Sequence, residues 1–230
     1  MWSPSSRAPA AAGSGPARDG TGQPAGTRSV LDARLRRIID PPLERAAARL
    51  VRRGWTADAV TIAGFGVGLL AMLAIALGAP LLGLGLFLLN RLGDGLDGAV
   101  ARRTALTDRG GYLDIVLDFV LYSGIVFAFA LADPARNALP AAFLVFSFVG
   151  TGTSFLAFAV MAAKRGLESD ARGRKSLYYL GGLTEGAETI ACFALFCLWP
   201  ATFPALAWGF GALCWLTTTA RVLAAVRALT

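Results

Sequence analysis

The chain has 230 residues, of which 55% are hydrophobic and 16% are charged, and its formal net charge at pH 7 is +7. Soluble domains typically carry about 25% charged residues, so this composition is that of an integral membrane protein. Histidine is absent, which excludes Ser-His-Asp catalysis and histidine-ligated zinc. The basic balance does not indicate nucleic-acid binding, because no RRM, zinc or helix-turn-helix pattern accompanies it. The cysteines, Cys192, Cys197 and Cys214, lie in apolar segments and are predicted to be packing residues.

The first part of the chain divides into two segments of different composition. Residues 1–28 are rich in Ala, Gly, Pro, Ser and Arg, so they predict a disordered tail. Residues 29–54 predict an amphipathic juxtamembrane helix, because apolar residues recur at helical spacing while arginines fill the other faces. Asp40, Pro41 and Pro42 predict an interruption of that helix. We expect it to lie in the membrane interface on the cytoplasmic side; an ordinary soluble helix packed on the body is the alternative.

Residues 55–230 predict one all-α integral membrane domain with six transmembrane helices. Several apolar segments approach the ~20 residues that a helix needs to cross a bilayer. The connections on one side contain a single positive residue, Arg136, whereas Lys and Arg accumulate on the other side. The positive-inside rule therefore places both termini and the acidic motifs at the cytoplasmic face. The predicted spans cover residues 57–79, 81–103, 111–132, 139–163, 184–199 and 203–227.

Four aspartates lie at the cytoplasmic ends of the second and third predicted spans. Asp94 and Asp97 are three residues apart, and Asp114 and Asp118 are four apart, so each pair shares one helix face. Acids at this depth are costly and usually face the bundle interior, and four carboxylates brought together repel one another unless protons or cations intervene. Oxygen ligands without His or Cys select Mg²⁺, Mn²⁺ or Ca²⁺. Four such groups can hold a pair of ions suited to displacement at phosphorus.

The residues around the first acidic pair support binding of a phosphate group. Glycines lie between the acids, where a missing side chain lets a ligand approach the backbone. The planar fork of Arg102 suits a phosphate oxygen. In the alternative interpretation the acids only form ion pairs that stabilise helix ends, for example Asp94 with Arg91 or Arg102. Asp108 lies in the polar stretch LTDRGG and is predicted to be a solvated loop residue.

The stretch DGLDGAVARRTALTDRGGYLDIVLD, residues 94–118, resembles the signature of the CDP-alcohol phosphotransferases. That signature reads D-x-x-D-G-x-x-A-R, then, after a short gap, G-x-x-x-D-x-x-x-D. The resemblance covers about residues 55–228 and includes the order of the six spans. It implies transfer of a phosphatidyl group from a CDP-linked lipid, usually CDP-diacylglycerol, to an alcohol, with CMP as the leaving group. The matching positions are Asp94, Asp97, Gly98, Ala101, Arg102, Gly110, Asp114 and Asp118.

The resemblance also implies a role for each of these residues. The four aspartates bind two divalent ions, Mg²⁺ or Mn²⁺, which grip the diphosphate. Asp118 is in addition the base that takes the proton of the acceptor hydroxyl. The nucleotide pocket is formed by Gly98, Ala101, Arg102 and Gly110, with Thr61 of the first span as a further candidate.

Two kinds of acceptor alcohol are compatible with the charged residues near the later predicted spans. Lys164, Lys175 and Arg221 favour a phosphorylated acceptor such as glycerol 3-phosphate or inositol phosphate, although positive-inside topology explains them equally well. Glu185 and Glu188 open the fifth predicted span, where they either bind a polyol or an amino alcohol or act as helix caps.

Three stretches resemble an uncharacterised bacterial inner-membrane branch of the family: KSLYYLGGLTEGAETI, NRLGDGLDGA and GTGTSFLAF. They predict a multi-pass protein of the bacterial inner membrane. The small residues of GTGTSFLAF, beginning at Gly150, favour either a homodimer seam or internal packing.

Two other classes of protein are compatible with a membrane domain that contains four acids. One is a cation transporter that uses the acids as an ion path; Arg102 and the glycines beside the acids argue against it, as does the lack of an inverted repeat. The other is a catalytically inactive scaffold, which the complete signature disfavours. The sequence therefore predicts a metal-dependent membrane enzyme that transfers a phosphatidyl group from CDP-diacylglycerol to a small polar alcohol.

Overall fold

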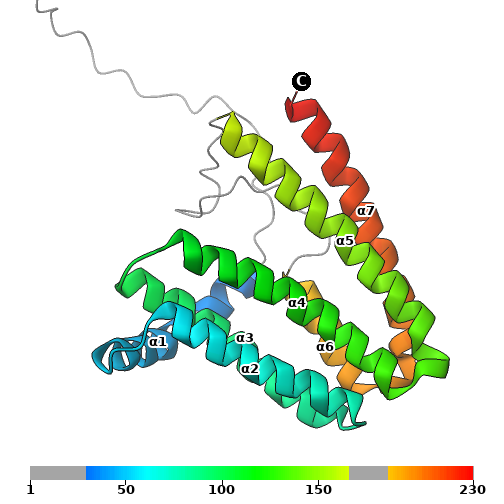
Figure 1. The fold of residues 1–230 in the computed structure, drawn as a ribbon, viewed down its shortest axis with the longest axis horizontal. Helices are drawn as coiled ribbons and strands as arrows, with labels where there is room; N and C mark the ends of the chain where they lie inside the picture. Colours follow the sequence, from blue (N-terminus) through cyan, green and yellow to red (C-terminus); the bar gives the residue numbers. More distant parts are fainter. Residues whose placement is uncertain (1–29, 166–185, 230) are drawn as a thin grey trace, which may run out of the picture. The chain divides into compact units, whose positions relative to one another are not determined.

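The computed structural model describes residues 30–165 and 186–229, and side chains from residue 41 onward. All regular elements in these ranges are helical, which confirms the predicted all-α class (Figure 1). In chain order they are α1 (Val30–Arg52), α2 (Ala57–Ala76), α3 (Pro80–Arg103), α4 (Asp108–Ala132), α5 (Pro134–Lys164), α6 (Gly186–Leu198), the short 3₁₀ helix η2 (Pro200–Thr202) and α7 (Phe203–Leu229).

Helix α1 begins in one compact unit, residues 1–39, and ends in the other, residues 40–230. Its helical backbone continues through Pro41 and Pro42, so the predicted interruption at these residues is wrong. A proline removes its own N–H bond and crowds the carbonyl four residues earlier, but a helix can continue past such a position with a local distortion. The predicted tail, residues 1–28, lies outside the described residues.

Capping side chains and prolines set the starts of the membrane helices. The hydroxyls of Thr56 and Thr107 accept hydrogen bonds from backbone N–H groups in the first turns of α2 and α4. Asp133 caps α5 in the same way, and Pro134 occupies its first turn, where a missing N–H costs little. Helix α5 therefore begins at Pro134 rather than at the predicted residue 139. The connections between successive helices from α2 to α5 are short, and α3 packs along α2 while α5 packs along α4.

Helix α2 packs against both α3 and α4, and α4 packs in turn against α5. Helices α5 and α7 lie side by side, while α6 contacts α3 and α7 (Figure 1). Aromatic rings fill the core between these helices: the Phe129 and Phe203 rings stack at 4.8 Å between centroids, and Phe193 lies 5.6 Å from Phe87. Phe87 lies on α3, one helical turn before Arg91, so the apolar core reaches the acidic end of that helix.

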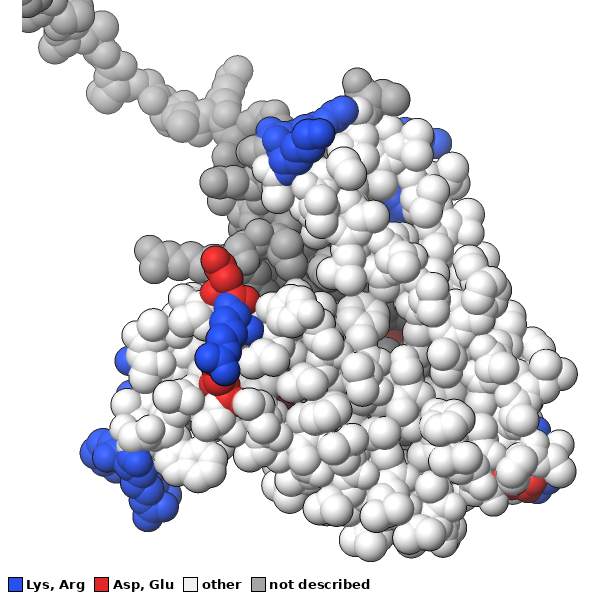
Figure 2. Space-filling model, viewed as in Figure 1, with Lys and Arg blue, Asp and Glu red and all other residues white. Residues whose placement is uncertain are grey.

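Four helices within the described residues are long and apolar enough to cross a membrane, namely α2, α4, α5 and the segment Pro200–Leu229. Helix α3 has 24 residues, but Arg91, Asp94 and Asp97 interrupt its apolar run. The described part of α6 has 13 residues. The count of six spans therefore stays a prediction. Figure 2 shows one face of the molecule, on which charged side chains form small groups separated by uncharged surface.

Glycines let several helices approach closely. A Cβ on Gly152 of α5 would lie 2.5 Å from the Phe119 ring of α4, and one on Gly150 would lie 3.2 Å from the Trp215 ring of α7. Both positions belong to the GTGTSFLAF stretch. The structure therefore places these two glycines in internal helix contacts, which is one of the two roles predicted for this stretch.

Candidate metal and phosphate site

Three of the four predicted carboxylates converge. One oxygen from each of Asp94, Asp97 and Asp114 lies within 4.8 Å of the other two. Asp97 is buried, Asp94 is half-buried and Asp114 is exposed, so the group opens from the protein interior toward the surface. We call Asp94, Asp97 and Asp114 the aspartate triad. The i, i+3 spacing on α3 and the start of α4 bring these oxygens together, as the sequence pattern predicted.

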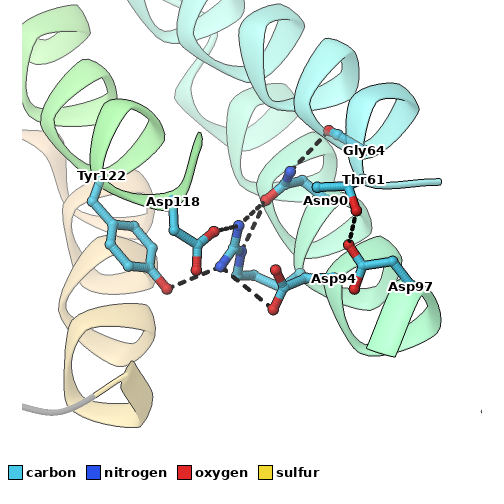
Figure 3. A network of polar contacts seen from close by, with 8 residues as sticks. Thr61, Gly64, Asn90, Asp94, Asp97, Asp118 and Tyr122 are labelled. Carbon is cyan, nitrogen blue, oxygen red and sulfur yellow. Dashed lines mark hydrogen bonds and ion pairs between the residues drawn. The ribbon is translucent and has the colours of Figure 1, made fainter. Parts of the chain in front are cut away.

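Thr61 supports the triad from a third helix. Its hydroxyl on α2 lies 2.6 Å from Asp97 Oδ2 and 3.1 Å from the Ala57 carbonyl, so its single proton goes to the nearer carboxylate oxygen (Figure 3). The sequence predicted Thr61 to be part of a nucleotide pocket. The structure places its hydroxyl against a triad carboxylate, which it can hold in one orientation; the nucleotide role stays a prediction.

The fourth aspartate, Asp118, lies next to Arg91, for which the sequence indicated only Asp94 as a partner. Arg91 Nη2 donates to Asp118 Oδ1 at 2.7 Å, while Arg91 Nη1 lies 3.9 Å from Asp94 Oδ2. Asn90 Oδ1 and the Tyr122 hydroxyl accept further hydrogen bonds from the same guanidinium (Figure 3). Arg91, Asn90 and Tyr122 were not predicted as site residues. Tyr122 follows Asp118 by one helical turn, and that spacing is the signal that links them.

Arg102, predicted to bind a phosphate, pairs with an acid of α1. Arg102 Nη2 lies 3.2 Å from Glu44 Oε1, and Arg103 Nη2 lies 2.8 Å from Glu44 Oε2. The hydrogen bond from Arg103 has the larger effect and that from Arg102 the next largest. Both lower the pKa of the Glu44 carboxyl below its ordinary value. The Arg102 side chain is 61% exposed, so the guanidinium is accessible to a ligand. Glu44 was missed, because nothing in the sequence shows that residues 44 and 102 are neighbours.

The small residues of the signature lie close to polar groups. A Cβ on Gly98 would lie 3.4 Å from Arg102 Nη1. A Cβ on Gly110 would lie 3.2 Å from Asp58 Oδ1, and Arg109 Nε pairs with the other oxygen of Asp58 at 3.3 Å. Ala101 is half-buried.

Asp108 is the exposed first residue of α4 rather than part of a loop, because the Thr107 cap starts the helix there.

The predicted acceptor residues lie on three other parts of the chain. Lys164 is exposed at the end of α5, and Glu188 is exposed in the first turn of α6. Arg221 of α7 is buried and donates to the Thr151 carbonyl of α5 at 2.9 Å, with the Phe155 ring 5.7 Å from its guanidinium carbon. Lys175 and Glu185 lie outside the described residues.

The donor set of the triad fits a divalent cation. Three carboxylate oxygens within 4.8 Å of one another provide hard oxygen ligands, the kind that Mg²⁺ and Mn²⁺ prefer. One of the carboxylates is held by the Thr61 hydroxyl, and ligating carboxylates are commonly oriented by such hydrogen bonds.

Comparison of the chain with models of protein families supports this assignment of the site. The family model of the CDP-alcohol phosphatidyltransferases matches residues 55–226, which is most of the chain and includes the triad, Asp118 and Arg91. The chain belongs to the CDP-alcohol phosphatidyltransferase family. Membership confirms the predicted family, the enzyme class and the all-α integral membrane fold.

Two relatives are similar in sequence. The inner membrane protein YnjF of Escherichia coli strain K12 is 53% identical over 193 residues, which cover 84% of this chain and 94% of YnjF. This match confirms the predicted likeness to a bacterial inner-membrane branch. The archaetidylinositol phosphate synthase of Pyrococcus horikoshii is 33% identical over 105 residues, which cover 45% of this chain and 56% of that enzyme.

The fold is also similar to crystal structures of the phosphatidylinositol phosphate synthase PgsA1 of Mycobacterium tuberculosis. The structure with CDP-DAG bound has a TM-score of 0.59 at 22% identity and covers 80% of this chain and 92% of PgsA1. The structure in complex with manganese and citrate has a TM-score of 0.60 at 22% identity and covers 80% of this chain and 88% of PgsA1. At this identity the likeness concerns the fold alone.

Proposed function

We propose that the protein transfers a phosphatidyl group from CDP-diacylglycerol to a small polar alcohol and releases CMP. The observation that carries this proposal is the convergence of Asp94, Asp97 and Asp114 on one point, with Asp118 one turn further along α4. In the reaction the acceptor oxygen forms a bond to the phosphorus of the phosphatidyl group. The bond from that phosphorus to the oxygen of CMP breaks, and the acceptor proton moves to Asp118.

The triad and Asp118 are proposed to hold two divalent ions, Mg²⁺ or Mn²⁺. Such ions, when bound, neutralise negative charge on the pyrophosphate oxygens. The donor set supports this assignment, as does the PgsA1 structure in complex with manganese and citrate. The hydrogen bond from the Thr61 hydroxyl to Asp97 would keep that carboxylate oriented for a bound ion.

The remaining signature residues are proposed to position the nucleotide. Arg102 is exposed and has the planar fork that suits a phosphate oxygen. Gly98, Ala101 and Gly110 keep the surface beside the acids free of large side chains, so that the cytidine diphosphate can approach the backbone. Asp118 acts as general base, a role that typically accelerates a reaction by about 10²–10⁴-fold.

A phosphorylated acceptor, such as glycerol 3-phosphate or inositol phosphate, is the second candidate. Arg221, a buried cation between α5 and α7, favours it, and two of the similar proteins are named as inositol phosphate synthases. Lys164 and Lys175 would then assist in binding the phosphate. Glu185 and Glu188 favour a polyol or an amino alcohol instead. Membership of this family argues against a cation transporter.

We further propose that the protein is a multi-pass protein of the bacterial inner membrane, with its termini and its active site on the cytoplasmic side. The similarity to YnjF and the apolar helices support the location. The accumulation of Lys and Arg in the connections on one side supports the orientation.

Release of CMP from CDP-diacylglycerol by the detergent-purified protein tests the proposal. We expect release only with Mg²⁺ or Mn²⁺ and a suitable alcohol, and EDTA should abolish it. A panel of acceptors that includes glycerol, glycerol 3-phosphate, inositol, inositol phosphate and amino alcohols identifies the acceptor class. Absence of CMP release with every acceptor and both ions would overturn the proposed function.

A matched pair of variants ties the activity to the triad. Asp114→Asn should abolish CMP release, because it removes a triad carboxylate. Asp108→Asn makes the same chemical change at an exposed acid of the same helix, outside the triad. It should leave activity close to that of the wild type. Equal losses in both variants would remove the assignment of Asp114 to the metal site.

A further inference from the structure

The guanidinium of Arg91 lies among the acids of the site, but neutral groups hold much of it. Asn90 Oδ1 accepts from Arg91 Nε at 2.8 Å and from Nη2 at 2.6 Å, and the Tyr122 hydroxyl accepts from Nη1 at 3.0 Å. The guanidinium carbon lies 5.8 Å from the ring centroid of Phe87 and 5.1 Å from that of Tyr122. The side chain is only 10% exposed. These neutral contacts hold the guanidinium in addition to its contacts with Asp118 and Asp94.

Asn90 is itself held in place. It is buried, and its Nδ2 donates to the Gly64 carbonyl of α2 at 2.8 Å. A Cβ on Gly68 would lie 3.3 Å from the same Nδ2, so the helices are packed closely around this amide. The Asn90 amide therefore directs its oxygen toward Arg91. The position of the guanidinium is thus set by groups on α2, α3 and α4.

The Arg91 guanidinium lies at different distances from the aspartates of the site. Arg91 Nη2 lies 2.7 Å from Asp118 Oδ1, whereas Nη1 lies 3.9 Å from Asp94 Oδ2. Asp118 is engaged by a charge-assisted hydrogen bond, while Asp94 converges with the other members of the triad. The sequence signature contains all four acids. In the structure three of them form the triad, and the fourth, Asp118, is hydrogen-bonded to Arg91.

We propose that Arg91 is a positioning residue with two separable effects on the site. Its charge lowers the affinity of the triad for divalent cations, because a positive charge close to the triad repels them. Its hydrogen bond to Oδ1 orients Asp118, so that the other carboxylate oxygen takes the proton of the acceptor hydroxyl. This inference rests on the proposed function. The first effect depends on charge alone, and the second depends on the planar guanidinium.

Substitution of Arg91 separates the two effects. Arg91→Met removes the charge and the hydrogen bonds, whereas Arg91→Lys keeps the charge and loses the planar fork. Binding of Mn²⁺ is measured on detergent-purified protein without lipid substrate, from the electron paramagnetic resonance signal of free Mn²⁺. kcat is measured separately by CMP release at saturating Mn²⁺. Arg136→Met is the matched control, because it makes the same change at an exposed arginine of α5.

We expect the affinity for Mn²⁺ to depend on the charge at residue 91, and kcat to depend on the planar guanidinium. We expect Arg91→Met to bind Mn²⁺ about tenfold more tightly than the wild type, a change of about 1.4 kcal/mol. Arg91→Lys should bind Mn²⁺ with wild-type affinity. Both variants should have a kcat at least about tenfold lower, because Asp118 loses its fixed orientation. Arg136→Met should match the wild type in both measurements.

Each contrary outcome has a distinct meaning. If the wild type binds Mn²⁺ and folded Arg91→Met binds it with equal or weaker affinity, the inference fails and the proposed function stands. If Arg91→Met does not fold, Arg91→Lys decides, and an unchanged kcat in that variant overturns the positioning role. If the wild type itself binds no Mn²⁺, the metal site of the proposed function fails as well.

Discussion

Thr61 lies on a different helix from the acids, yet its hydroxyl contacts the most buried member of the triad, Asp97, at 2.6 Å. Hydrogen bonds to charged groups contribute about 1.5–3 kcal/mol. Thr61→Val keeps the shape of the side chain and removes this bond. We therefore expect the Mn²⁺ concentration for half-maximal CMP release to rise by about tenfold or more.

Thr61→Ser is the control for that prediction. It keeps the hydroxyl and removes only a methyl group, so its Mn²⁺ requirement should stay close to that of the wild type. If the Val and Ser variants need the same Mn²⁺ concentration, the hydrogen bond does not orient Asp97 for metal binding.

Asp118 is the residue to which both the base role and the Arg91 contact are assigned. Asp118→Asn keeps an oxygen that can accept from Arg91 but removes the capacity to take a proton. Turnover should fall by at least about 10²-fold, while the thermal unfolding midpoint stays near that of the wild type. Measurement of kcat at saturating Mn²⁺ checks this, because it separates loss of the base from loss of metal. Retained turnover in that variant would assign the base to another group.

Gly152 lets α5 pack closely against α4. A Cβ on Gly152 would lie 2.5 Å from the Phe119 ring, so Gly152→Ala forces the ring or the helices to move. Overpacking of this kind typically costs about 1–3 kcal/mol. The apparent thermal unfolding midpoint in detergent should therefore fall. Gly209→Ala is the matched control, because α7 leaves open space at that position and Ala favours helix over Gly by about 1 kcal/mol. A fall of equal size in both variants would show that the close contact is not what Gly152 provides.

The helices and the pairing of acids within one helix could be predicted from local sequence, because apolar runs and i, i+3 or i, i+4 spacing are local properties. The convergence of Asp114 with Asp94 and Asp97 joins two helices, and the family signature, which groups all four aspartates, is what indicated it. The helix starts at Ala57 and Phe203 agree with the predicted spans, and the start of α5 differs because Asp133 and Pro134 form a cap that the apolar pattern does not reveal. Arg91 and Glu44 could not be assigned in this way. The contact of Arg91 with Asp118 and that of Glu44 with Arg102 each join two helices, and only the tertiary structure brings these residues together.

The distribution of charge along the chain indicates how the chain crosses the membrane. The net charge is +7, and Lys and Arg gather in the connections next to the acidic motifs. The positive-inside rule therefore predicts that the carboxyl end of α7 lies in the cytoplasm and that the connection between α4 and α5 lies outside. With the proposed function, this orientation would release CMP, a soluble nucleotide, into the cytoplasm.

Single cysteines at exposed alanines test this orientation. Ala135→Cys lies at the start of α5, and Ala228→Cys lies near the end of α7; both alanines are exposed. The native cysteines are buried, so they should contribute little background. A membrane-impermeant maleimide added to spheroplasts should label Ala135→Cys and spare Ala228→Cys. In inside-out vesicles the pattern should reverse, because the vesicle exterior is then the cytoplasmic face. Labelling of both positions from the same side would mean that an odd number of crossings does not separate them, and the predicted order of spans after α4 would be wrong.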